Sequence, residues 1–238
     1  MKKLLFMLGL ILMLASVAMA DQVQVGYPGS GYGPYEAFPG GEFTLTPINP
    51  TGWLDLSSYG AQARNAGGSS GSFQTFCISG VDNIYPNGVY NAEVSRNAIR
   101  SNTGSGGDPV SVGTGWLYSQ FASGNWENNL TYNYSGTANE RRADAFLLQQ
   151  AIWWLEGQEG VSYSSANKYM LAVMNKFGSD AQADGGWEYG VYALNLTTDN
   201  GGRIQSQLYY HVPDTGATIA LLGFAVVGLA LVSSRLRA

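Results

Sequence analysis

Two apolar segments, one at each end of the chain, limit the part of this sequence that can fold in water. The first spans residues 4–17 and follows a basic start with two lysines. Small residues at Ala18 and Ala20 come directly after it. A basic start, an apolar run and a small-residue cleavage site are together typical of a secretory signal peptide. We therefore expect residues 1–20 to be removed on export.

The second apolar segment spans residues 217–232 and is followed by a basic end with Arg235 and Arg237. Its 16 residues fall short of the roughly 20 that a helix needs to cross a bilayer, which predicts a marginal transmembrane helix. The positive-inside bias keeps the arginines on the cytoplasmic side and the rest of the chain outside. Pro213 favours an extended backbone before the apolar run, open to a processing enzyme. An ordinary single-pass anchor is the alternative.

A five-residue motif precedes that segment and consists of Val212, Pro213, Asp214, Thr215 and Gly216. Motif, apolar run and basic end together resemble the PEP-CTERM class of exosortase sorting signals in its VPDSG variant, with Thr215 in place of serine. The resemblance implies an exosortase-type processing enzyme and transient insertion of residues 217–232 into the inner membrane. It also implies delivery to the cell surface or extracellular matrix of a Gram-negative bacterium that makes exopolysaccharide. A sortase signal of the LPxTG type is the alternative. Val212 argues against it, because that signal has leucine at this position.

The remaining body, residues 21–211, is 191 residues long and suits one extracytoplasmic domain. Four of the chain's 12 basic residues lie at its two ends, and all 17 acidic residues lie between them. The stretch between the basic ends therefore carries 17 acidic against 8 basic residues, a net charge of −9. A charge of this sign disfavours binding to nucleic acid or to an anionic membrane surface.

The composition of the body indicates a β-rich fold. The full chain contains 32 glycines and 15 tyrosines, most of them in the body, and only 12% of its residues are charged. Strands are predicted at 42–47, 72–78, 189–196 and 203–210, the last two as a hairpin, whereas 27–41 reads as a loose arm. We predict an α+β fold, a β-rich sandwich or barrel with an inserted helical segment.

The inserted segment has a helix period. Thr137 and Glu140 form a capping-box pattern, and the helix is expected to run through residue 156 and end at Gly157. Phe146, Gln149 or Gln150, and Trp153 fall along one of its stripes, and the helix is expected to be widely buried. Shorter helices are expected at 114–122 and 165–177.

Cys77 is the only cysteine of an exported chain, so it has no internal disulfide partner. A buried apolar filler, an intermolecular crosslink and a reactive thiol all stay open for it. Phe76 and Ile78 flank it on a predicted strand.

Two short motifs resemble bacterial thioester domains, which are surface adhesins. The first is Phe76-Cys77-Ile78, and the second is the run from Leu148 to Trp153, in which Leu148 stands where the family has threonine. The resemblance implies an internal thioester between the Cys77 thiol and the Gln149 carboxamide, which an amine on a surface ligand would then attack. A Leu-Gln-Gln-Ala-Ile-Trp run is also typical of an ordinary amphipathic core helix.

Other candidate sites carry less support. His211 is the single histidine and lies beside the predicted cleavage motif, so neither a catalytic triad nor a metal site built from histidines is expected. The carboxylate pairs Asp180/Asp184 and Glu156/Glu159 have the chemistry for glycoside hydrolysis but no supporting motif. Five tryptophans could form a platform on which sugar rings stack, but most of them are expected in the core. They are Trp116, Trp126, Trp153, Trp154 and Trp187.

These patterns lead to a non-enzymatic surface or matrix protein without cofactor or metal. Its expected role is adhesion or association with exopolysaccharide, through the Cys77–Gln149 thioester. The alternatives are a non-covalent structural or carbohydrate-binding surface protein, a sortase-anchored surface protein, and a carbohydrate-acting enzyme.

Overall fold

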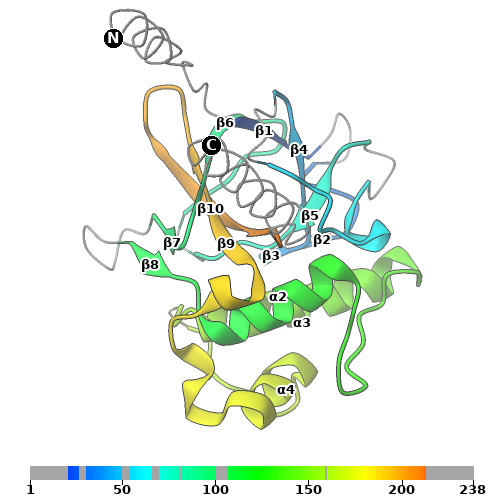
Figure 1. The fold of residues 1–238 in the computed structure, drawn as a ribbon. Helices are drawn as coiled ribbons and strands as arrows, with labels where there is room; N and C mark the ends of the chain where they lie inside the picture. The colour runs from blue at the N-terminus through cyan, green and yellow to red at the C-terminus, as the bar shows by residue number, and fades with distance from the viewer. Residues whose placement is uncertain are drawn as a thin grey trace, which may run out of the picture.

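The computed structural model describes residues 21–26, 31–49, 54–65, 70–80, 82–99, 107–158 and 160–212 (Figure 1). The predicted signal peptide and the predicted membrane segment at 217–232 lie outside these residues. Within the described ranges, no helix is both long and apolar enough to span a bilayer.

Most strands belong to one antiparallel sheet with the order β10-β9-β6-β1-β4-β5. Two small two-stranded sheets, β2-β3 and β7-β8, accompany it. The strands are β1 (Asp21–Val25), β2 (Glu36–Ala37), β3 (Gly40–Gly41), β4 (Phe43–Pro47), β5 (Phe73–Thr75), β6 (Val89–Ser95), β7 (Asn97–Ala98), β8 (Asp108–Pro109), β9 (Val191–Thr197) and β10 (Arg203–Tyr210).

The two edges of the large sheet meet, so the sheet is a nearly closed barrel. Directly after β5 the chain runs alongside β10, where Cys77 pairs with Gln207 in an antiparallel bridge. Backbone hydrogen bonds flank that bridge, from Ile78 N to Ser206 O at 3.0 Å and from Leu208 N to Phe76 O at 3.0 Å. Closure in this way pairs edge groups that would otherwise be open to another chain. Cys77 therefore lies at the seam of the barrel.

The helices gather at one end of the barrel, where α2 and α3 lie side by side and α4 packs outside them (Figure 1). They are α2 (Val112–Ser123), α3 (Ala138–Leu155) and α4 (Lys168–Phe177), with short 3₁₀ turns η1 (Ala61–Ala63), η3 (Gly178–Gln182) and η4 (Gly186–Tyr189). The predicted capping box starts α3: Thr137 Oγ1 accepts from Glu140 N, and Glu140 accepts from Thr137 N.

The α+β prediction, with a β-rich barrel and an inserted helical segment, is confirmed for the described residues. β4, β10 and all three helices lie within two or three residues of their predicted ranges. Strands β1 and β6, at the middle of the sheet, were not predicted from the sequence.

Two local predictions are wrong. The described part of the expected loose arm is instead a turn and the β2-β3 hairpin, which packs on α3. Phe146 belongs to the helix expected to be widely buried, but it is 40% exposed, because the buried face follows Ala145, Leu148 and Ile152.

Candidate functional site

Gln149 lies where three segments meet: helix α3, the β2-β3 hairpin and the barrel seam at Cys77. It occupies the buried face of α3, one turn before Trp153. Its side chain is 1% exposed and that of Cys77 is 0% exposed. The structure therefore brings together the two residues singled out from the sequence, in a place closed to water.

The Gln149 carboxamide is hydrogen-bonded through both its oxygen and its nitrogen. Its Oε1 accepts hydrogen bonds from Cys77 N at 3.1 Å and from Gly41 N at 3.3 Å. The Cys77 thiol donates to the same oxygen at 3.2 Å. Its Nε2 donates to Cys77 O at 2.8 Å. The amide plane is thus fixed beside the thiol by backbone groups from two separate segments.

The hairpin glycines let the backbone come this close. A Cβ at Gly40 would lie 2.7 Å from Gln149 Cγ and 2.9 Å from a ring carbon of Trp153. Gly41 has φ +115°, a conformation that L side chains rarely adopt. Sequence reasoning missed these two residues; the signal was the Gly-Gly pair itself, which marks a close backbone approach in a strand.

The environment of Cys77 is apolar. Burial raises the pKa of its thiol well above the ordinary value. The Trp153 Nε1–H is itself buried and lacks a hydrogen-bond partner within the described part of the chain. At neutral pH Cys77 is a protonated thiol whose proton points at the Gln149 oxygen.

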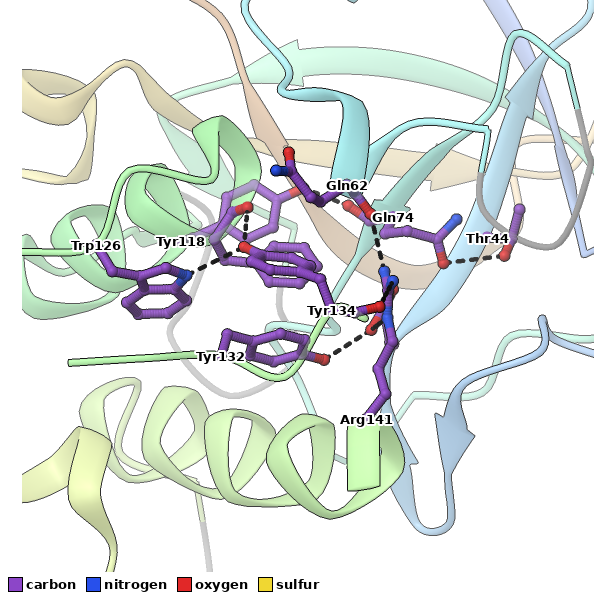
Figure 2. A network of polar contacts seen from close by, with 10 residues as sticks. Thr44, Gln62, Gln74, Tyr118, Trp126, Tyr132, Tyr134 and Arg141 are labelled. Carbon is purple, nitrogen blue, oxygen red and sulfur yellow. Dashed lines mark hydrogen bonds and ion pairs between the residues drawn. The ribbon is translucent and has the colours of Figure 1, made fainter. Parts of the chain in front are cut away.

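A buried ion pair anchors the start of α3 to the barrel (Figure 2). The Arg141 guanidinium binds both carboxylate oxygens of Glu42, which precedes β4. Tyr132 Oη donates to Glu42 at 2.6 Å, and Arg141 also donates to the backbone of Gln62 at 3.0 Å. Two turns further along the same helix lies Gln149, so this anchor helps to fix the position of its side chain.

Chemically, the amide oxygen of Gln149 lies between two backbone N–H donors. Such an arrangement stabilises negative charge on the oxygen during acyl transfer. The neighbouring thiol is a nucleophile once it is deprotonated.

The other candidates from the sequence do not form a site among the described residues. Asp180 and Asp184 are exposed, and Glu159 lies outside the described ranges. Glu156 is buried and accepts hydrogen bonds from the side chain and backbone of Ser111 at 2.8 and 3.2 Å. Among described side chains no group of three histidine, cysteine or acidic residues is placed to hold a metal ion.

The tryptophan side chains that were candidates for a sugar-stacking platform differ in how deeply they are buried. Trp116 and Trp153 are buried in the core at 2% and 6% exposure. Trp126 and Trp154 are partly buried against the core, and Trp187 is half-buried, with the Arg96 guanidinium 5.0 Å over its ring. His211 lies 4.0 Å from an Asp55 carboxylate oxygen.

Of the terminal motifs, only Val212 is described. Its N–H donates to Ser58 Oγ at 2.9 Å, which holds the end of β10 against the body. Pro213, Asp214, Thr215 and Gly216, and the predicted cleavage residues Ala18 and Ala20, lie outside the described residues.

Comparison with known proteins bears on the tail. Residues 211–236 match the family model described as the VPDSG-CTERM motif. No curated protein and no solved structure matches the chain. None of these findings supports the resemblance of the body to thioester domains. The tail match indicates an exported, surface-directed protein that is processed by an exosortase-type enzyme.

Proposed function

We propose that this chain is a surface or matrix adhesin whose body forms an internal thioester between Cys77 and Gln149. The observation that carries the proposal is the contact of the Cys77 thiol with Gln149 Oε1 at 3.2 Å in a water-excluded site. Without that contact, the two sequence motifs alone do not distinguish a reactive pair from core packing.

The bond-forming step balances within the two side chains. Cys77 Sγ attacks Gln149 Cδ, and negative charge develops on Oε1, where the Cys77 and Gly41 N–H groups donate. The C–N bond then breaks, Nε2 takes the thiol proton, and ammonia leaves. A thioester remains, and no oxidant or cofactor takes part.

The second step consumes the thioester. A primary amine on a surface ligand attacks the same carbon, the C–S bond breaks, and the amine proton passes to Cys77 Sγ. The product is an amide crosslink between Gln149 and the ligand. Because the crosslink is permanent, each molecule reacts once and the protein is not an enzyme.

The proposed partner is an amine-bearing surface molecule or an amine-bearing component of the exopolysaccharide. The body has few amines of its own, since Lys168 and Lys176 are its only lysines. Lys168 is engaged by Asp144 and Lys176 by Glu127. Reaction between copies of the protein is therefore limited.

A purely structural pairing is the second candidate. Three hydrogen bonds of Gln149 satisfy backbone groups of Gly41 and Cys77 that would otherwise be buried without partners, and burial keeps the Cys77 thiol protonated. On this alternative the body acts as a non-covalent surface protein that binds or packs without chemistry at Cys77.

Intact mass separates the two candidates. The full-length chain, purified in detergent, is expected to weigh one ammonia less than its sequence requires and to gain one methylamine when that amine is added. Cys77→Ala and Gln149→Glu should both abolish the methylamine gain. Gln182→Glu, a matched change at an exposed glutamine, should retain it. A full-mass protein that ignores methylamine would leave the structural pairing as the function of these residues.

A further inference from the structure

A cavity of about 310 Å³ opens beside the Cys77–Gln149 pair. Six of the residues that line it are Pro39, Gly80, Gln150, Trp153, Gln158 and Val161. Its size falls at the lower end of small-ligand pockets, about 300 to 1,000 Å³. Gly80 and Gly160, both on its wall, are exposed, so the cavity communicates with solvent.

Trp153 borders both this cavity and the buried pair. Its ring lines the cavity, yet only 6% of the residue is exposed. A Cβ built at Gly40 would lie 2.9 Å from the Trp153 ring and 2.7 Å from Gln149 Cγ. The ring and the glutamine side chain are therefore immediate neighbours. Cys77 and Gln149 do not themselves line the cavity among the described residues. Trp153 is thus a residue that both lines the cavity and contacts the surroundings of Gln149.

The walls of the cavity suit an aliphatic arm with one polar end. Pro39, Trp153 and Val161 supply apolar surface. Gln158 is engaged, since its Oε1 accepts from Gly80 N at 3.0 Å. Gln150 is next to Gln149 on α3, and its side-chain amide makes no hydrogen bond to another described residue. Its carbonyl oxygen is an acceptor for an amine N–H.

We propose that this cavity is the binding site for the incoming nucleophile, a primary amine on an unbranched aliphatic arm, and that Trp153 must move to admit it to the Gln149 carbonyl carbon. The proposal rests on the proposed thioester and adds the route and the kind of amine. It predicts that the size of the amine and the free volume of the cavity together set the rate of crosslinking.

Gly80 offers a clean test of the route. A Cβ at Gly80 would lie 3.8 Å from the Trp153 ring, in ordinary contact, so a larger side chain there occupies cavity space without a backbone clash. Gly80→Leu should lower the rate of reaction with butylamine about tenfold or more, because a misplaced nucleophile loses its productive geometry. Methylamine should be slowed less. Val89→Thr, at an exposed strand position that does not line the cavity, is the control.

The readout is the intact mass of the full-length chain over time, and it distinguishes the two claims. If the untreated chain lacks one ammonia and Gly80→Leu reacts with butylamine as fast as the unsubstituted chain, the cavity is not the route, although the thioester stands. If the untreated chain has full mass, the thioester fails, and iodoacetamide labelling of Cys77 then tests the route alone. Labelling that Trp153→Ala accelerates and Gly80→Leu suppresses supports the route, whereas equal rates in all three chains overturn it.

Discussion

Cys77 Sγ and Gln149 Oε1 lie 3.2 Å apart although 72 residues separate them in the chain. One residue belongs to the seam of the barrel and the other to the buried face of α3. The contact therefore depends on how the helix is seated against the barrel. Several side chains hold the helix against the barrel, and substitutions at them have separate expected outcomes.

Replacing Gln149 by leucine should reduce the free energy of unfolding by about 2 to 4 kcal/mol, because three buried backbone groups lose their partners. These groups are the N–H and C=O of Cys77 and the N–H of Gly41. Urea unfolding measures the loss. The matched control is Gln150→Leu, at the half-buried neighbour, where a change within about 0.5 kcal/mol is expected. Equal effects at the two positions would mean that the Gln149 hydrogen bonds do not matter for stability.

The buried ion pair makes a stronger prediction. Arg141→Met leaves the fully buried Glu42 carboxylate without its cation and should cost about 3 to 5 kcal/mol. A second change, Glu42→Gln in the same chain, should restore part of the loss, because the uncompensated charge is then gone. Arg142→Met, one residue along at an exposed position, should have little effect. A double variant no more stable than Arg141→Met alone would contradict an electrostatic origin.

Glu156 should make stability depend on pH. Burial raises the pKa of its carboxyl from 4.5 to about 7 in the folded chain, against the opposing effect of hydrogen bonds from Thr114 and Ser111. As pH rises from 4.5 to about 7, the unfolded chain loses this proton and the folded chain keeps it, so stability falls across that window. The contribution is on the order of 3 kcal/mol.

Glu156→Gln keeps an amide oxygen as acceptor for Ser111 and removes the titration. Thermal unfolding across the same pH window should therefore show a shallower decline in stability for the variant. Parallel profiles for the two chains would show that Glu156 does not titrate there.

A methyl group at Gly40 tests the close approach of the hairpin to α3. Gly40→Ala places a Cβ 2.7 Å from Gln149 Cγ and 2.9 Å from the Trp153 ring, so the hairpin or the side chains must shift, at a cost of about 1 to 3 kcal/mol. Gly80→Ala is the control, since its Cβ meets nothing closer than 3.8 Å. Urea unfolding of both variants checks the difference, and a Gly40→Ala chain as stable as Gly80→Ala would place the hairpin further from α3.

The sequence predicted the helices and the last hairpin well because their signals are local. Thr137 and Glu140 mark the start of α3 within four residues, and the turn at 198–202 joins β9 to β10. Strands β1 and β6 are not marked by local start or stop signals of this kind. Their place in the middle of the sheet is set by pairing with strands that are distant in the sequence.

The candidate site was predictable only in part for the same reason. Cys77 and Gln149 stand out as residue types in short motifs. Gly41 and Trp153 gain their roles from the approach of a hairpin that pairs locally but packs on a helix more than a hundred residues later. That approach depends on the closure of the barrel and on the Glu42–Arg141 pair, which no local pattern encodes.

Peptide-level mass spectrometry of the chain after treatment with methylamine tests the Cys77–Gln149 thioester at the two residues themselves. A thioester predicts a methylamide on Gln149, and a Cys77 thiol that becomes alkylatable in the same molecules. An unmodified Gln149 in every peptide, together with a Cys77 thiol that alkylates on unfolding without any amine treatment, would contradict it.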